Sequence, residues 1–180
     1  MGNCFNTPVV ATNINLKDNP EDISFSKIKG TASMLYSFGT WIYVNSFQNN
    51  KIITYIDTTN LPIFSLVLGE MSNSHVLTAV LNINDKEQNI VITKNFPIQK
   101  WVYVVVAVDT TSFDCYLDGK LVGSTIIYQK LTSQSGSIKF GNFIGENGDI
   151  ILAKVSRWDY YLDPTTVYKE YSSGNGQKNR

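Results

Sequence analysis

The stretch WVYVVVAV, residues 101–108, decides the fold. Its apolar residues follow one another without the polar interruptions of a half-exposed element, and valine dominates the run. A short run of this kind, rich in β-branched residues, is typical of a strand that is covered on both faces. Residues 101–108 are therefore expected to form a central strand of a sheet.

A hairpin signal follows this strand, DGK at residues 118–120. Glycine adopts positive φ at no steric cost, so Asp118-Gly119 favours a tight turn between two antiparallel strands. These strands are expected over residues 113–117 and 121–127.

Further outward, short runs rich in Val, Ile, Tyr and Phe recur, separated by Asn, Asp, Gly and Ser. Regularly spaced short strands with turn residues between them indicate a sandwich or barrel. One helix is expected over residues 165–171, because Asp163-Pro164 places a capping carboxylate before a proline. We predict an all-β sandwich of two antiparallel sheets with one short C-terminal helix. The remaining strands are expected at residues 37–45, 51–56, 63–68, 76–83, 89–93, 137–140 and 149–155.

Composition limits the class of protein. Of the 180 residues, 43% are hydrophobic and 17% are charged, which suits one folded domain with a sizeable core. Lys+Arg and Asp+Glu both number 15, so no excess positive charge is available to bind nucleic acid. No run approaches the roughly 18 apolar residues of a membrane-spanning helix. The two cysteines are expected to be free thiols, because a secreted disulfide framework would be denser.

The chain divides into three parts by composition. Residues 1–30 are polar and are interpreted as an arm that could include one short strand, because this composition can bury little. The sandwich is expected over residues 31–176 and a polar tail over residues 177–180. The first 30 residues lack a basic start followed by an apolar run, so secretion through a signal peptide is not expected.

The N-terminal sequence MGNC offers two lipidation candidates, Gly2 and Cys4. N-myristoylation requires Gly2 after removal of the methionine, and usually Ser or Thr at position six, where this chain has Asn6. Palmitoylation of Cys4 would add the second acyl chain that stable membrane anchoring needs. The alternative is an ordinary, unmodified N-terminal segment.

Three motifs combine the expected strands and turns into a longer pattern. Their order along the chain is more specific than any one of them, since an Asp-Gly turn occurs in many hairpins. They are FGTWIYV (38–44), WVYVVVAV followed by DCYLDGKLV (101–108 and 114–122), and GDIILAKVSRW followed by YLDP (148–158 and 161–164).

In order and spacing these motifs resemble the laminin-G-like, pentraxin-like branch of the concanavalin A-like lectin/glucanase superfamily, over roughly residues 30–176. The resemblance implies a concanavalin A-like jelly-roll sandwich. The segment NFPIQKW, residues 95–101, and the Asn- and Ile-rich composition are similar to the versions found in large DNA viruses of eukaryotes. That similarity implies a virion or capsid-associated protein.

The acidic residues do not indicate an enzyme. Some relatives of this fold are glycoside hydrolases, which place two carboxylates roughly 5–10 Å apart across a sugar bond. On one strand this separation needs acids at positions i and i+2. Only Asp85 and Glu87 have that spacing, in an expected exposed turn. His75 is the only histidine and no Gly-x-Ser-x-Gly elbow is present, so a Ser-His-Asp site is not indicated either.

A binding site has several candidate residues. Carbohydrate sites combine aromatic platforms with carboxylate or amide groups, and Tyr116, Asp118, Tyr160 and Tyr161 are the candidates for such a site. Strand packing and hairpin formation explain the same four residues more simply. Cys115 alternates with Tyr116 and is interpreted as a small buried hydrophobe on the other face.

No resident cofactor is indicated, and calcium is the one metal for which a loop offers donors. Asn142, Glu146 and Asp149 supply oxygen atoms within one short segment, and relatives of this fold often bind calcium with loop oxygens. A solvated turn explains the same residues, because hard cations need six or more oxygens and the spacing matches no defined calcium loop.

Two functions fit these observations. The first is a non-catalytic structural component of a virion, in a minor capsid or membrane-apposed position, with other structural proteins as partners. It would lie in the virion or the host cytoplasm, and at a membrane surface if its N-terminus is acylated. The second is a lectin-like module whose partners are glycans.

Overall fold

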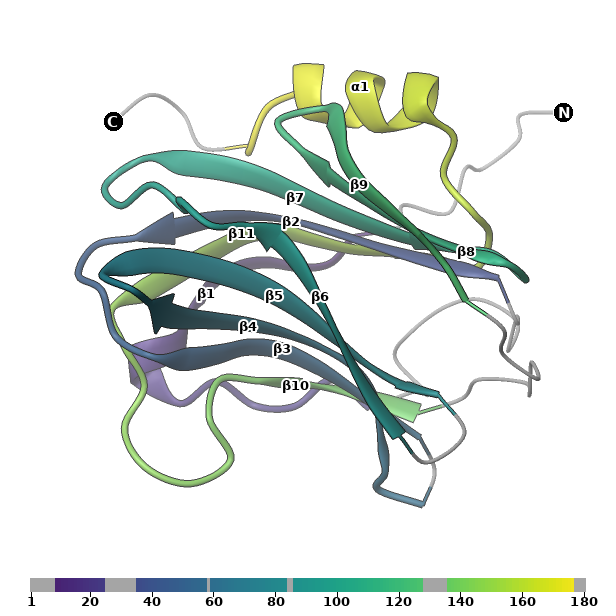
Figure 1. Cartoon of the computed structure of the whole chain (residues 1–180). Helices are drawn as coiled ribbons and strands as arrows, with labels where there is room; N and C mark the ends of the chain where they lie inside the picture. Colours follow the sequence, from purple (N-terminus) through teal and green to yellow (C-terminus); the bar gives the residue numbers. More distant parts are fainter. Residues whose placement is uncertain (1–8, 25–34, 58, 84–85, 128–135, 177–180) are drawn as a thin grey trace, which may run out of the picture.

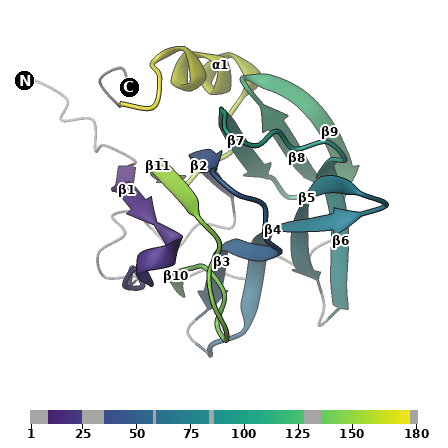
Figure 2. The same ribbon diagram turned by 90° about the vertical axis from the view of Figure 1, so that its left-hand side faces the viewer.

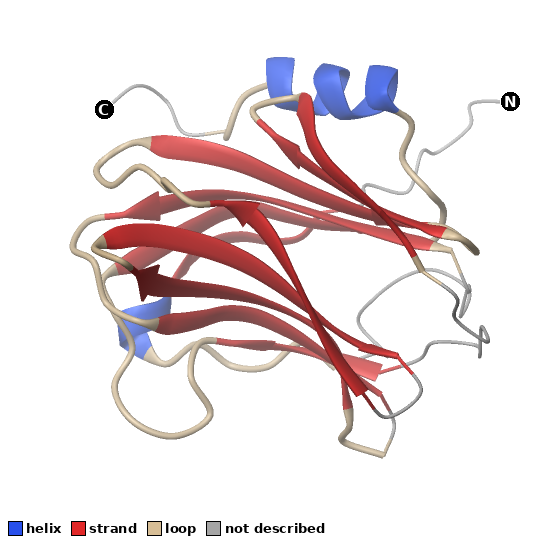
Figure 3. Ribbon diagram, viewed as in Figure 1, coloured by secondary structure: helices blue, strands red, loops and turns tan. Residues whose placement is uncertain are grey.

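The computed structural model describes residues 9–24, 35–57, 59–83, 86–127 and 136–176. Within these residues two antiparallel sheets face one another, and one α-helix lies against the outside of one sheet (Figure 1). Strands account for most of the ordered elements, as Figure 3 shows. The predicted all-β sandwich with one short C-terminal helix is confirmed.

The six-stranded sheet has the order β1-β11-β2-β7-β8-β9. Its central strand β7 covers the predicted residues 101–108 and is buried from residue 102 to residue 108. The valine-rich run lies here because both faces of the strand are covered, so no polar side chain is needed on either. The strands of this sheet are β1 (Val9–Asn15), β2 (Tyr36–Val44), β7 (Trp101–Val108), β8 (Ser112–Leu117), β9 (Lys120–Ile126) and β11 (Ile150–Trp158).

The five-stranded sheet has the order β10-β3-β4-β5-β6. Its strand β6 starts at Lys86, so Lys86 and Glu87 belong to the ladder and not to the preceding turn as the sequence suggested. The strands of this sheet are β3 (Asn50–Asp57), β4 (Pro62–Met71), β5 (Ser74–Ile83), β6 (Lys86–Thr93) and β10 (Gly136–Phe140).

The main core fills the space between the two sheets. Phe38 stacks on Phe64 with ring centroids 5.7 Å apart, and Tyr55 packs against Phe38 at 5.2 Å. Cys115 faces this core as a free thiol with no exposed surface. Burial raises the pKa of its thiol to about 12, so it behaves as the small buried hydrophobe that the sequence indicated.

A second apolar layer lies on the outer face of the six-stranded sheet, beneath α1 (Pro164–Ser172). Trp41 stacks against Tyr171 of the helix at 5.5 Å, and Trp158 is 4% exposed. Trp101 is partly buried and packs against the same layer, so all three tryptophans lie on this outer face and not between the sheets. We call this group the helix-covered layer; its buried members are Trp41, Tyr103, Val105, Ala107, Tyr116, Ala153, Trp158, Leu162 and Val167.

Helix α1 begins where the sequence indicated. Asp163 is the N-cap residue, and its carboxylate accepts hydrogen bonds from the backbone N–H groups of Thr165 and Thr166 at 2.9 and 3.0 Å. Pro164 occupies the first turn, where a missing N–H costs nothing. Among the described residues, no helix is long and apolar enough to cross a membrane.

The N-terminal region contributes more to the sandwich than its polar composition suggested. Strand β1 pairs with β11 at the edge of the six-stranded sheet, as Figure 2 shows. Leu16, in the short 3-10 helix η1 (Leu16–Asp18), is fully buried in the main core. Ile23 forms an isolated antiparallel bridge with Ile138. Gly2 and Cys4, the lipidation candidates, lie outside the described residues.

Candidate ligand-binding site

The loop between β10 and β11, residues 141–149, is tied to the sandwich by asparagine side chains. Asn50 is only 2% exposed, and its Oδ1 accepts a hydrogen bond from the backbone N–H of Gly148 at 2.7 Å. Oδ1 of Asn142 accepts from the backbone N–H of Lys51 at 2.8 Å. We call residues 141–149 the Asn50 loop, because Asn50 holds its base.

A second set of hydrogen bonds holds the other side of the Asn50 loop. Oδ1 of Asn147 accepts from the backbone N–H of Asn142 at 2.6 Å, and its Nδ2 donates to Oδ1 of Asn19 at 3.0 Å. The amide of Asn142 donates to the carbonyl of Glu146 at 2.9 Å. Because each amide side chain both donates and accepts, this network fixes the loop backbone against two separate parts of the chain.

An open pocket of about 350 Å³ lies between the Asn50 loop and the segment that follows η1. Three amide side chains line it, those of Asn19, Asn142 and Asn147. Lys139 and Asp22 also line the pocket, with the ammonium nitrogen 3.9 Å from a carboxylate oxygen. This ion pair is half exposed and adds little stability, but it places both charges beside the pocket. The lining therefore suits a ligand with several hydrogen-bonding groups.

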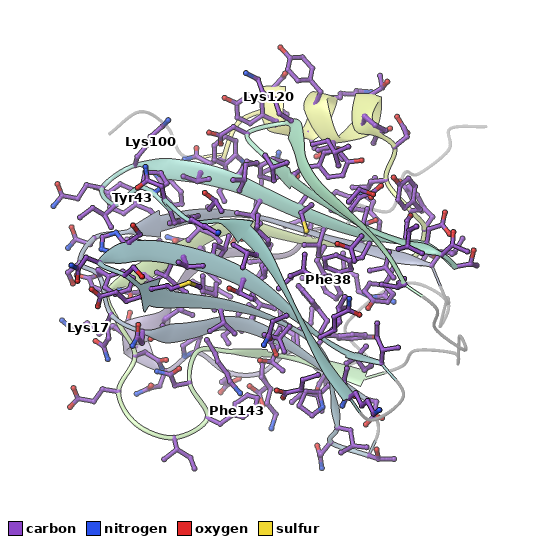
Figure 4. All side chains as sticks on the ribbon, viewed as in Figure 1. Lys17, Phe38, Tyr43, Lys100, Lys120 and Phe143 are labelled. Atoms are coloured by element: carbon purple, nitrogen blue, oxygen red, sulfur yellow. The ribbon has the colours of Figure 1, made fainter. Side chains whose placement is uncertain are left out.

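The tip of the Asn50 loop exposes two apolar side chains. Phe143 is 47% exposed and Ile144 is 93% exposed. The ammonium groups of Lys51 and Lys139 lie 4.7 and 5.4 Å from the centroid of the Phe143 ring, within range of a cation–π attraction. Figure 4 shows Phe143 at the outer side of the five-stranded sheet. The two lysines thus orient an aromatic ring that also lines the pocket.

The calcium candidates all lie in this loop, but several of their oxygens already accept hydrogen bonds, in the case of Glu146 the backbone carbonyl only. Asn142 accepts from Lys51, the Asp149 carboxylate accepts from Nδ2 of Asn45 at 2.8 Å, and the Glu146 carbonyl accepts from Asn142. Across the described ranges, no three His, Cys, Asp or Glu side chains gather where they could hold a metal ion. Calcium binding at these residues stays a prediction.

Two of the four carbohydrate-site candidates meet on the outer face of the six-stranded sheet. The hydroxyl oxygens of Tyr116 and Tyr161 lie 3.5 Å apart, and the Tyr161 hydroxyl donates to Asp114 at 2.5 Å. Burial raises the pKa of Tyr161, and the hydrogen bond to Asp114 raises it further, because an ionised Tyr161 would face a carboxylate. Tyr116 is 1% exposed, so it serves mainly to pack the helix-covered layer.

The other two candidates lie apart from that pair. Asp118 closes the β8–β9 hairpin: its Oδ1 accepts from the backbone N–H of Tyr103 at 2.9 Å, and its φ is 47°. Gly119 follows with φ 77°, which matches the turn predicted from the sequence. Tyr160 is 51% exposed, and its carbonyl accepts from Ser37 at 2.9 Å. The structure thus gives Asp118 a role in the fold and leaves Tyr160 accessible.

The structure describes two of the three residues considered for catalysis, Glu87 and His75. Glu87 is exposed on β6, and Asp85 lies outside the described residues. His75 stacks on Phe47 with ring centroids 4.0 Å apart.

A family model described as the concanavalin A-like lectin/glucanases superfamily matches residues 20–173. This chain belongs to the concanavalin A-like lectin/glucanase superfamily. The resemblance stated from the three motifs is therefore confirmed. A comparison with curated proteins finds no match.

Several solved structures share this fold at low sequence identity. A native heptameric SAP-like pentraxin from Limulus polyphemus has a TM-score of 0.66 and 13% identity, with 95% of this chain and 80% of that one covered. The botulinum neurotoxin type G receptor binding domain has a TM-score of 0.60 and 16% identity. That match covers 77% of this chain but only 38% of the toxin domain. At these identities the likeness establishes the fold alone.

Sequence reasoning missed most of the residues that form the pocket and that hold or expose the Asn50 loop of this concanavalin A-like domain. Asn19, Asn50 and Asn147 looked like ordinary turn residues, and Phe143 and Ile144 were not singled out. One signal was available: two adjacent apolar residues in a loop rich in Asn and Gly are unusual, because such a loop exposes them.

Proposed function

We propose that this chain is a non-catalytic binding domain that holds a carbohydrate at the pocket beside the Asn50 loop. The observation that carries the proposal is the combination of amide-lined walls with an exposed aromatic ring at the rim. Sugar hydroxyls pair with amide donors and acceptors, and the apolar face of a sugar ring packs on an aromatic side chain. Asn19, Asn142, Asn147 and Phe143 provide these groups.

The rigidity of the Asn50 loop supports this proposal. A binding loop that is already fixed loses little conformational entropy when the ligand arrives. The buried amide of Asn50 and the bond from Asn147 to Asn19 hold the pocket walls before any ligand is present.

The names of similar structures also favour binding over catalysis. One is a receptor binding domain of a botulinum neurotoxin, and another is a botulinum neurotoxin DC binding domain in complex with rat synaptotagmin II, at 21% identity and a TM-score of 0.57. Asp114 and Asp118 point the same way, since both accept hydrogen bonds within the fold. Incubation with β-glucans is expected to release no reducing sugar.

A glycan array followed by calorimetric titration tests the proposal. The wild-type domain is expected to bind at least one glycan class, and Phe143→Ala is expected to weaken that binding about tenfold through loss of the aromatic contact. Tyr168→Ala is the matched control, because Tyr168 is a similarly exposed aromatic residue on α1, at 58%. An array without binders, or a Phe143→Ala variant that binds like wild type, contradicts the proposal.

The test also separates two possible sites. If Tyr160→Ala abolishes glycan binding and Phe143→Ala does not, the ligand binds at the tyrosines identified from the sequence. The Asn50 loop would then not be the site.

A finer proposal concerns the biological setting: that this domain serves in the virion of a large DNA virus and contacts other structural proteins there. It rests on the similarity of residues 95–101 to viral versions of the fold, and on the apolar side chain of Ile144, which a neighbouring protein would cover. Cross-linking and mass spectrometry of purified particles test it, and absence of the chain from those particles contradicts it.

Acylation of Gly2 and Cys4 is a separate part of that proposal. Two acyl chains would hold the domain at a membrane surface. Intact-mass measurement on natively expressed protein checks this, and an unmodified Gly2 or a retained methionine refutes it.

A further inference from the structure

One buried cation lies between the two sheets, far from the Asn50 loop. Arg157 stands near the end of β11 and is 3% exposed. It lies directly across from Phe38 of β2 in the sheet register, so both side chains face the interior. Figure 4 labels Phe38 in this space between the sheets. The pocket proposed for carbohydrate lies near the start of β3 and β11, whereas Arg157 lies near the end of β11 and beside Tyr55, near the end of β3.

Tyr55 is the hydrogen-bonding neighbour of this arginine among the described residues, but no N–H of the guanidinium group reaches ordinary hydrogen-bond geometry with it. Nε, Nη1 and Nη2 of Arg157 are all buried and without a partner, and so is the hydroxyl of Tyr36. The guanidinium carbon lies 5.7 Å from the centroid of the Tyr55 ring. An aromatic ring at this distance attracts the positive charge. The ring face does not, however, accept hydrogen bonds from the N–H groups that lie in the plane of the guanidinium group.

The strands around Arg157 do not supply an anion. In β2, β3 and β11 the one acidic residue is Asp57. Its Oδ1 accepts from the backbone N–H groups of Thr59 and Leu61 at 2.8 and 2.9 Å, so this carboxylate serves a surface turn. Arginine stays protonated in proteins. It therefore cannot avoid the energetic cost of burying a charge by losing its proton, as a buried lysine can. A buried charge without a partner is strongly unfavourable, and native proteins rarely keep one without use.

We propose that Arg157 and Tyr36 form a binding site for a carboxylate between the two sheets. The planar guanidinium group donates two parallel N–H bonds to the two oxygens of one carboxylate, and the Tyr36 hydroxyl donates a third. One carboxylate neutralises one guanidinium, whereas sulfate or doubly charged phosphate would leave a net negative charge in the interior. The aromatic rings of Phe38 and Tyr55 border the site and favour a ligand with an apolar body behind its carboxylate.

Thermal unfolding in rising concentrations of sodium acetate tests this site, with sodium chloride at equal ionic strength as the reference. In wild type, acetate at about tenfold its Kd is expected to raise Tm by roughly 3–6 °C above chloride, and to saturate. Arg157→Met is expected to lose this increment and Tyr36→Phe to reduce it. Lys100→Met, which removes an exposed lysine, is the control and should keep the increment.

The result separates the possible sources of the carboxylate. A larger shift with hexanoate than with acetate assigns the site to the head of a bigger apolar acid, and equal shifts assign it to a free small carboxylate. If chloride matches acetate, or if Arg157→Met keeps the full increment, the site does not exist.

A second measurement uses the unaltered protein, in case Arg157→Met does not fold. Saturation of the aromatic proton signals is expected to transfer to the methyl signal of bound acetate in an NMR difference spectrum. Absence of transfer over the concentrations that span the thermal shift overturns the proposal. Neither measurement involves the pocket beside the Asn50 loop, so this inference stands or falls separately from the proposed carbohydrate binding.

Discussion

The helix-covered layer and the Asn50 loop are both rich in aromatic and polar side chains, but they use them in opposite ways. In the former, Tyr116 and Trp158 are buried under α1, and the hydroxyl of Tyr161 bonds to Asp114 beside the Tyr116 hydroxyl. In the latter, amides bond inward to hold the base while Phe143 and Ile144 face solvent. In this domain, the tyrosines and aspartates identified from the sequence mainly support the fold. The exposed apolar side chains on the fixed Asn50 loop are the better indicator of a binding site.

The largest effect is expected on the stability of the domain, when a side chain of the helix-covered layer is truncated. Trp158→Ala removes a large side chain that is 4% exposed, and we expect the free energy of unfolding to fall by about 3–5 kcal/mol. Ligand binding at the Asn50 loop should persist wherever the domain is still folded. Chemical denaturation and calorimetry check both parts, and a loss below about 1 kcal/mol would contradict the assignment of Trp158 to a packed layer.

An intermediate effect is expected at the base of the loop, where stability and binding should fall together. Asn50→Ala leaves the N–H of Gly148 without its acceptor, and we expect a loss of about 1–3 kcal/mol and of ligand binding. Asn89→Ala, an exposed asparagine on β6, is the control and should change neither quantity. Retention of full binding by Asn50→Ala would mean that the loop needs no internal support.

The sequence was sufficient for the strands because their signals are local. The predicted residues 101–108 coincide with β7, since an unbroken apolar run has few alternatives to a strand covered on both faces. Asp118-Gly119 gave the hairpin turn because both positions need positive φ.

The site was less predictable because its parts come together only in the folded chain. Asn19, Asn50 and Asn147 lie far apart in sequence and meet through the pairing of β10 with β3 and the path after η1. The polar composition of residues 9–15 likewise left room for a short strand but did not show that this strand would pair with β11 at the edge of a sheet, because its partner lies far away in sequence. Periodicity also does not state whether a tryptophan faces the other sheet or a helix.

A smaller effect is expected at the hairpin, with no change in ligand binding. Asp118→Ala removes the acceptor for the Tyr103 N–H and places a less suitable residue at positive φ, at an expected cost of about 1–2 kcal/mol. Asp118→Asn keeps an acceptor and tolerates this backbone conformation, so it should unfold almost as wild type does. If Asp118→Ala loses glycan binding, Asp118 contacts the ligand in addition to closing the hairpin.

The smallest effect is expected from the cap of α1 and should depend on pH. Hydrogen bonds from Thr166 and Thr165 lower the pKa of Asp163 below its ordinary value of 3.8. A lowered pKa in the folded state means that the cap stabilises fully above pH 3.8, and that this contribution disappears as pH falls through the folded-state pKa. Tm measured from pH 6 to pH 2.5 should therefore fall more steeply for wild type than for Asp163→Asn. Parallel curves would show that the carboxylate is not needed as a charge.

The buried thiol of Cys115 is also a native chemical probe for opening of the fold. Only a thiolate reacts readily with alkylating reagents. A thiol with a pKa of about 12 and no exposed surface therefore does not react at neutral pH while the domain is folded. With Cys4 replaced by serine, the alkylation rate would report the small fraction of molecules in which the sheets have opened, because reclosing is faster than alkylation at low reagent concentration. At reagent concentrations where alkylation outpaces reclosing, the same rate would report how often the sheets open.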